Sequence, residues 1–172
     1  MFMLVIHTLI GVAAILIGFI VLRARKFSNT HTRLGEIYHW LMLVICVTAL
    51  AISYTRGRAN IFTYLAPPSY AAALLGYLMA KYRPANWLRW HISGQAGSYI
   101  ALLTAVLFQF VPRFWHTDTK ILGLSLAFWV TLIAPGIIGG FFIRRTQKRW
   151  AKANANTRLN KRRIAIDTST VI

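Results

Sequence analysis

The sequence predicts an all-α membrane protein, a polytopic transmembrane helix bundle of about five spans. Hydrophobic residues make up 57% of the 172 residues. They occur in stretches of about 20, which is the length that crosses the hydrocarbon core of a bilayer. The chain has 20 Lys and Arg but only three Asp and Glu, whereas the surface of a soluble domain carries both signs of charge. We therefore expect one membrane domain, residues 1–143, followed by a basic tail, residues 144–172.

The apolar stretches place the five spans along the chain. They are expected at residues 1–22, 35–54, 61–80, 91–111 and 121–143. The first is followed by basic residues, which is not the order of charge and apolar core in a secretory signal peptide. The third contains Pro67 and Pro68, which lack backbone donors, so we expect a kink or a break there. The fifth contains Pro135 near three glycines, a point of flexibility.

The distribution of basic residues predicts the orientation. The segments that follow spans one, three and five carry sixteen of the 20 Lys and Arg, and the segments that follow spans two and four carry four. Cytoplasmic segments are enriched in Lys and Arg, so the N-terminus is expected outside and the C-terminus in the cytoplasm of a bacterial cell, with the chain a multi-pass protein of the cytoplasmic membrane. The basic tail is expected to contact anionic lipid headgroups. Nucleic acid is not expected as a partner, because no recognised nucleic-acid-binding motif accompanies the charge.

The fourth span carries a polar stripe. On a helix, four polar residues of Trp90–Gln109 fall on one face, together with two small residues. They are His91, Gln95, Ser98 and Gln109, with Gly94 and Ala105 beside them. Unsatisfied polar groups in hydrocarbon cost several kcal/mol each, so this face should meet other helices or a water-filled cavity.

The first span combines a histidine with small residues on one face. His7, Gly11, Ala14 and Gly18 lie within about 60° of one another on a helical projection. Small residues allow a second helix to approach closely, which turns the histidine inward. The pattern fits a packing seam with a hydrogen-bonded His7, and it also fits a ligand or a proton relay, since ionisable residues inside membranes are often functional.

The second span opens with a histidine-rich segment. His31, Tyr38 and His39 share one face with Gly35, and Glu36 lies about 60° from His39. Glu36 is a candidate partner for a histidine ring or a metal, and it can equally pair with Arg33 at the membrane edge. The two histidines are about 12 Å apart along the helix axis, so they cannot share one ion if both are helical.

The predicted orientation brings these groups to similar depths. His31, Glu36, His39 and His91 fall in the cytoplasmic third of the bilayer, whereas His7 falls in the outer half. We take these five residues as the candidate cofactor-binding residues. The inner group could ligate haem through two rings, bind a metal or hydrogen-bond a quinone. It could equally be a polar network that fixes helix packing.

Three short stretches resemble a family of bacterial multi-span membrane proteins known as a domain of unknown function. They are His31-x3-Gly35-x2-Tyr38, Trp90-His91-Ile-x-Gly94-x2-Gly97-Ser98-Tyr99-Ile100 continuing to Leu103-Thr104-Ala105, and Pro135-x3-Gly139. They cover most of the chain in the family's order. The chain departs from the family after Ala105, where Val-Leu-Phe-Gln replaces an aromatic run leading into Asn or Asp. The resemblance points to His31 and His91 as candidate functional residues, but it does not imply an activity.

The sequence indicates a class of function but does not identify a reaction. It contains no nucleophile elbow, phosphate-binding loop or catalytic carboxylate pair, so no catalytic residue is assigned. The favoured interpretation is a small redox-linked protein with a histidine-lined haem or quinone site near the cytoplasmic face. The alternative is a small transporter, channel or accessory subunit whose polar stripe lines a path or meets a partner helix or a second copy. A zinc hydrolase is disfavoured, because Glu36 is the only carboxylate placed in the membrane.

Overall fold

The computed structural model describes residues 2–115 and 119–169 and confirms the prediction of an all-α bundle. Its five helices in these residues are α1 Phe2–Arg23, α2 Asn29–Thr55, α3 Ile61–Tyr82, α4 Trp87–Phe114 and α5 Leu126–Ser169. A two-stranded hairpin, β1 Lys120–Ile121 and β2 Leu124–Ser125, separates α4 from α5. In the described part of the chain, four of the helices are long and apolar enough to cross a membrane, namely α1, α2, α4 and α5.

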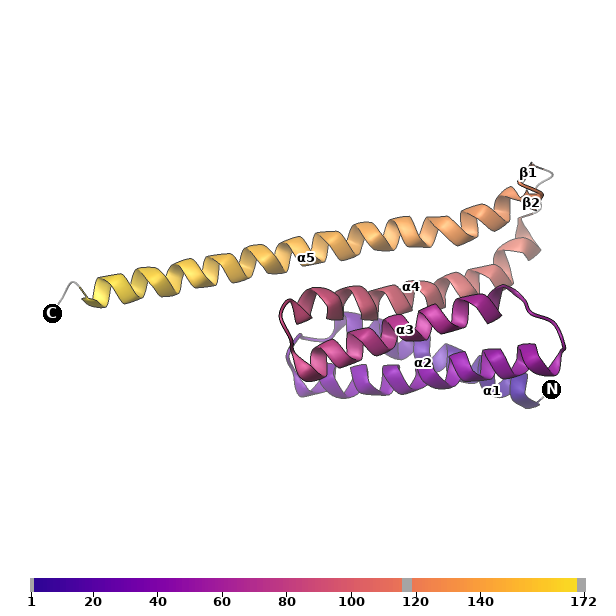
Figure 1. Cartoon of the computed structure of the whole chain (residues 1–172), viewed down its shortest axis with the longest axis horizontal. Coiled ribbons are helices and arrows are strands. Elements are labelled where there is room, and N and C mark those ends of the chain that lie inside the picture. The colour runs from indigo at the N-terminus through magenta and orange to yellow at the C-terminus, as the bar shows by residue number, and fades with distance from the viewer. Residues whose placement is uncertain (1, 116–118, 170–172) are drawn as a thin grey trace.

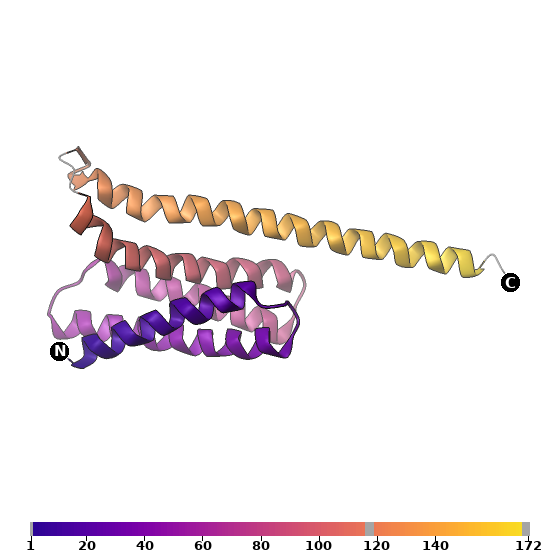
Figure 2. The same cartoon turned by 180° about the vertical axis from the view of Figure 1, so that it is seen from behind.

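Successive helices run in opposite directions (Figure 1). Helices α1 to α4 lie side by side, and α5 runs along α4 and continues well past the end of the other four. Figure 2 shows the same arrangement from the side of α1. The connections 24–28 and 83–86 lie at the end past which α5 extends, and we call this the basic end. The connection 56–60 and the β-hairpin lie at the other end, which we call the hairpin end.

Helix α3 has the limits expected for the third span to within two residues, but it continues through Pro67 and Pro68 as one helix, without the break that was one of the two expectations there. Just after the prolines the Ser69 hydroxyl donates to the Leu65 carbonyl, and Ala66 and Ala73 of α3 are buried against the neighbouring helices. Packing against neighbouring helices allows a membrane helix to retain proline.

The fifth helix differs from its expected limits. It begins at Leu126 and not at 121, because residues 120–125 form the hairpin. Leu122 and Gly123 have φ values of 51° and 78°, as a two-residue hairpin turn requires. At its other end α5 continues as one helix into residues 144–169, so no break in secondary structure marks the start of the basic tail. Hydropathy detects only the apolar half of such a helix.

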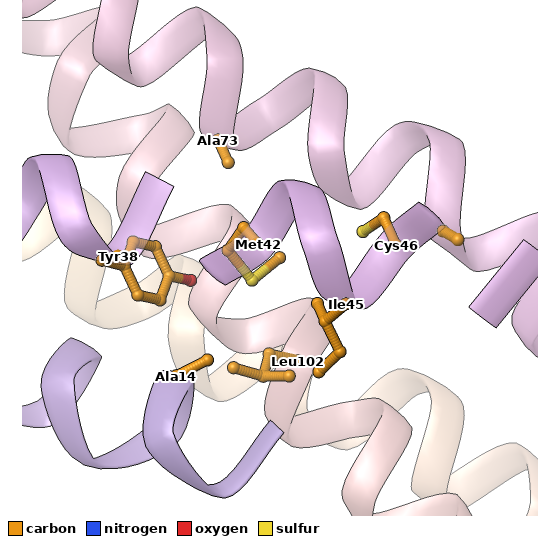
Figure 3. Packing of buried hydrophobic residues seen from close by; sticks show 8 residues of the cluster. Ala14, Tyr38, Met42, Ile45, Cys46, Ala73 and Leu102 are labelled. Carbon is orange, nitrogen blue, oxygen red and sulfur yellow. The ribbon is translucent and has the colours of Figure 1, made fainter. Parts of the chain in front are cut away.

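Met42 lies at the centre of the core (Figure 3). Its side chain is 1% exposed and is surrounded by Ala14 from α1, Ala73 from α3 and Leu102 from α4. Small residues on the surrounding helices leave room for this one long side chain. The core therefore forms where α1, α3 and α4 converge on α2.

The stripe predicted on α1 packs as expected. A Cβ at Gly18 would lie 2.6 Å from the Tyr99 ring and 3.0 Å from the Tyr38 ring, and Ala14 is fully buried. Most large side chains of α1 point away from the bundle, as Leu9 does with 65% of its surface exposed. An apolar face of this kind suits lipid contact.

Helices α3 and α4 approach most closely at two glycines. A Cβ on Gly94 would lie 2.5 Å from the carbonyl oxygen of Ala72 and 2.6 Å from the backbone nitrogen of Gly76. A side chain on Gly94 or Gly76 would therefore not fit between the helices. This close approach brings the start of α4 against the backbone of α3, which positions the site described next.

Candidate cofactor site

Two histidines meet at the basic end of the bundle. The ring centres of His31 and His91 are 6.3 Å apart, and the ring planes are nearly perpendicular at 83°. His31 is the third residue of α2, and its backbone N–H donates to the side chain of the N-cap residue Ser28 at 3.2 Å. His91 lies in the second turn of α4. Residues 60 positions apart in the sequence are thus brought together by the starts of two neighbouring helices.

Each ring is held by a backbone carbonyl of a different helix. Nδ1 of His31 lies 3.2 Å from the carbonyl oxygen of Val21 in α1, and Nδ1 of His91 lies 2.8 Å from that of Gly76 in α3. A carbonyl can only accept, so both Nδ1 atoms carry the hydrogen and donate it. In the neutral rings, Nε2 is then left with a free lone pair. This is the state in which histidine binds a metal, with the second ring nitrogen fixed by a carbonyl.

The pair lines a large groove of about 1070 Å³. One face of α4 forms its floor from His91 to Val111, and α5 forms one wall from Val130 to Trp150. The lining toward the hairpin end is mostly apolar. All the charged residues of the lining, together with several polar ones, gather at the basic end, whereas Thr131 is a polar residue toward the hairpin end. The group at the basic end includes Lys26, His31, Thr32, Glu36, Lys81, Arg83, His91 and Gln95.

Contacts from α5 close the basic end of the groove. The rings of Phe27 and Trp150 meet edge to face with centres 5.6 Å apart, which joins the 24–28 connection to α5. Nearby, the amide nitrogen of Gln147 donates to the Arg89 carbonyl at 3.0 Å and to the Ser93 hydroxyl at 2.8 Å. These contacts fix α5 beside the histidines, so a residue of the expected tail, Trp150, belongs to the site.

Lys26 is the cation held most firmly beside the pair. Its Nζ donates to the carbonyl oxygens of Val21 and Leu22, each at 3.0 Å. Val21 thereby accepts from both Lys26 and His31. Burial lowers the pKa of Lys26 below its usual value of 10.5. An ammonium group has three N–H donors, so one remains for a ligand.

His39 does not join the pair. It is 3% exposed and lies between two tyrosines of α3, with its ring stacked 4.4 Å from Tyr77 and 5.7 Å from Tyr70. Its Nδ1 is buried without a hydrogen-bond partner. Eight residues turn an α-helix by about 80°, so His31 faces α1 and α4 while His39 faces α3. The predicted cluster of three histidines is therefore split.

Glu36 and His7 are also separate from the pair. Glu36 is exposed at the edge of the groove, and among the described residues it forms no ion pair, so the expected pairing with Arg33 is not seen. His7 donates through Nδ1 to the Thr48 hydroxyl at 2.7 Å, because that hydroxyl gives its own hydrogen to backbone carbonyls of α2. His7 thus fits the packing seam.

The stripe on α4 faces inward along most of its length. Ser98 is fully buried and lies 3.1 Å from the Tyr38 hydroxyl, and the amide of Gln95 donates to the Ala73 carbonyl at 3.1 Å. Gln109, which was expected on the same inward face, is exposed. The stripe therefore packs against α2 and α3 near the basic end and leaves the bundle at the hairpin end.

The sequence did not reveal several parts of this site. Lys26 counted only as a charge between spans, and Trp150 lay in the expected tail. Gly76, whose carbonyl holds His91, gave no signal beyond being the one glycine of its helix. In the residues that the structure describes, no group of three or more His, Cys, Asp or Glu could hold a metal ion. No family model, curated protein or solved structure matches the chain.

Proposed function

We propose that this chain is a small redox-linked protein of the bacterial cytoplasmic membrane that holds a haem between His31 and His91. One observation carries the proposal. Two histidine rings from different helices lie 6.3 Å apart, and each is fixed through Nδ1 so that Nε2 is free. Haem iron is commonly held by side-chain ligands of this kind.

The spacing supports a single metal between the rings. A metal–nitrogen bond is about 2.0–2.1 Å, and Nε2 lies roughly 1.1 Å from its ring centre, so two imidazoles on one metal have centres roughly 6 Å apart. The observed 6.3 Å is close to this value.

The number of ligands supports haem over a bare ion. A structural zinc site needs four protein ligands and a catalytic one needs three. The described residues bring only two together. Haem provides four nitrogens itself and needs only the two axial positions. A quinone head is a poorer match at this point, because its carbonyl oxygens need donors and both Nε2 atoms are acceptors.

The surroundings fit the rest of the haem. The apolar walls of the groove suit the macrocycle, and Lys81 and Arg83 at the basic end suit its two carboxylates. Bound haem supplies one-electron chemistry. His31 and His91 would hold its iron, Phe27 and Trp150 would keep water out, and the carbonyls of Val21 and Gly76 would set the orientation of the two rings. Such a site favours electron transfer over oxygen binding.

We propose five membrane crossings with the basic end in the cytoplasm. Helix α3 has 22 residues and runs antiparallel between α2 and α4, which supports it as the fifth crossing. Sixteen of the 20 basic residues then lie on the cytoplasmic side. The basic residues of α5 beyond Ile143 would meet anionic lipid headgroups. Membership in the family that the three motifs resemble is part of this proposal.

A polar path through the bundle has less support. The side chains of Gln95 and Ser98, which would line it, bond to α2 and α3. The alternative of a transporter or channel therefore lacks a groove lined by free polar groups along α4.

The absorption spectrum of the purified protein tests the proposal. The protein is expressed with added haem precursor, extracted in mild detergent and compared with its His31→Ala, His91→Ala and His7→Ala variants. We expect a six-coordinate low-spin spectrum for the parent and for His7→Ala, which is the control. Each of the other two variants should lose that spectrum or the haem itself. A parent without a Soret band, or spectra unchanged in both variants, would refute the proposal.

A further inference from the structure

We propose that Lys26 is a positioning residue of the haem site, which holds His31 through a shared carbonyl and raises the reduction potential of the bound haem. This inference rests on the proposed function, because the potential exists only when haem is bound. It gives a role to a side chain that is neither an axial ligand nor a partner of the haem carboxylates. Three features support it, namely the fixed position of the ammonium group, its distance from His31 and the lack of a carboxylate partner.

The end of α1 fixes the side chain of Lys26. Val21 and Leu22 lie in the last turn of α1, where backbone carbonyls lack a donor within the helix. The Lys26 ammonium donates to both of these carbonyl oxygens, each at 3.0 Å. The helix dipole also favours a positive charge at a helix C-terminus. The ammonium group therefore has a defined position, unlike that of a lysine that extends freely into water.

One carbonyl oxygen joins Lys26 to His31. The oxygen of Val21 accepts from Nζ of Lys26 at 3.0 Å and from Nδ1 of His31 at 3.2 Å. The two nitrogens therefore cannot be more than about 6.2 Å apart, which is the sum of these distances. Because both donors bind the same oxygen, Lys26 also helps to hold the acceptor that orients the His31 ring.

This distance is short enough for the charge of Lys26 to act on the iron. A metal–nitrogen bond is about 2.0–2.1 Å, so an iron on Nε2 of His31 would lie within about 10 Å of the ammonium group. Reduction adds one electron to the haem, and Lys26 would stabilise the added negative charge. At about 10 Å and an effective dielectric constant of about 20, Coulomb's law gives at least about a tenfold change in the ratio of reduced to oxidised haem. Tenfold corresponds to about 59 mV for a one-electron couple.

Lys26 differs from the other cations that line the groove. Lys81 and Arg83 are exposed, and the haem carboxylates would neutralise them. Lys26 is only partly exposed, and among the residues that the structure describes it forms no ion pair. Glu36, the one carboxylate in the described lining, is exposed, so water screens its charge. Lys26 is therefore the cation that should act most strongly on the haem.

Redox titration of the haem-loaded protein tests the role of Lys26. The parent and its variants are titrated with dithionite and redox mediators in detergent at pH 7, and absorption spectra report both iron coordination and the reduced fraction. Lys26→Met removes the charge, whereas Lys26→Arg retains it. Arg25→Met is the matched control, because it removes one exposed charge of the same connection from outside the groove. We expect the midpoint potential to fall by about 59 mV or more in Lys26→Met, which is tenfold in the redox ratio, and to stay close to that of the parent in the other two variants.

The spectra separate this role from a structural one and from the proposed function. A residue that only capped α1 would change the stability of the protein but not the potential of a haem that stays six-coordinate and low-spin. Equal potentials in Lys26→Met and the parent, or an equal fall in Arg25→Met or Lys26→Arg, would overturn the inference and leave the haem proposal intact. A parent that binds no haem would overturn both.

A second variant covers the loss of folding. Lys26→Gln keeps an N–H donor without the charge, and it replaces Lys26→Met if that variant does not fold or does not keep the six-coordinate spectrum. We expect the same fall in potential for Lys26→Gln. A six-coordinate spectrum lost in both variants would limit Lys26 to holding His31 and overturn its role in the potential.

Discussion

The close approach of α3 and α4 makes Gly94→Ala a sharp test of the structure. A new Cβ would lie 2.5 Å from the Ala72 carbonyl oxygen, whereas ordinary contacts begin at 3.4 Å. The obstacle is backbone on both sides, so the helices must separate by the difference, about 0.9 Å. The hydrogen bond from His91 to Gly76, now 2.8 Å, would lengthen to about 3.7 Å and be lost.

The expected cost follows from three terms. Overpacking costs about 1–3 kcal/mol, and the lost hydrogen bond costs about 0.5–1.5 kcal/mol. The higher helix propensity of alanine offsets about 0.5–1 kcal/mol of this cost, because glycine is unfavourable inside a helix. The net destabilisation is about 0.5–4 kcal/mol, or about 1–16 °C in melting temperature at the roughly 2–4 °C per kcal/mol of a chain of this size.

Thermal unfolding in detergent, followed by tryptophan fluorescence, measures this effect. The control is Gly97→Ala, one turn away on α4, where a Cβ would meet nothing within 4 Å. That variant should be unchanged or more stable by about 0.5–1 kcal/mol. If Gly94→Ala melts at or above the temperature of the parent, the α3–α4 packing described here is wrong, and so is the reason for the position of His91.

Two further variants test the ends of the site. Ser28→Ala removes the N-cap side chain that accepts from the backbone of His31, and it should lower the free energy of unfolding by about 0.5–2 kcal/mol. Thr30→Ala, at an exposed position two residues away, should leave the melting temperature unchanged. Equal melting temperatures of the two variants would contradict the capping role. Burial lowers the pKa of Lys26, so between that pKa and 10.5 the unfolded chain binds more protons and the stability of the parent rises with pH. Relative to Lys26→Met, the melting temperature of the parent should therefore increase as the pH rises toward 10.5, and a constant difference would refute the inference.

The sequence predicted the helical elements better than their limits. Long apolar stretches locate α1 and α3 to within two residues and α2 and α4 to within six, because hydropathy responds to the property that a bilayer requires. It could not show that α5 continues into a basic segment, since a helix there has no apolar signal. It also could not show that α3 survives two prolines, because the support comes from neighbouring helices.

The candidate site was predicted in part, for a similar reason. Residue spacing and depth bring His31 and His91 to one level, and the structure places them side by side. Helical spacing placed His31 and His39 on one face, but the angle of about 80° between them is enough to turn His39 toward the tyrosines of α3. Contacts made across the bundle, such as Gly76 with His91, depend on the packing of two helices and have no local pattern.

Titration of haem into the purified haem-free protein tests the central claim most directly. The absorption change at each addition reports both stoichiometry and iron coordination. We expect saturation at one haem per chain with a six-coordinate low-spin spectrum. In a double variant that lacks both His31 and His91, we expect neither this stoichiometry nor this spectrum. Haem that binds equally well to that double variant, or that remains five-coordinate in the parent, would contradict it.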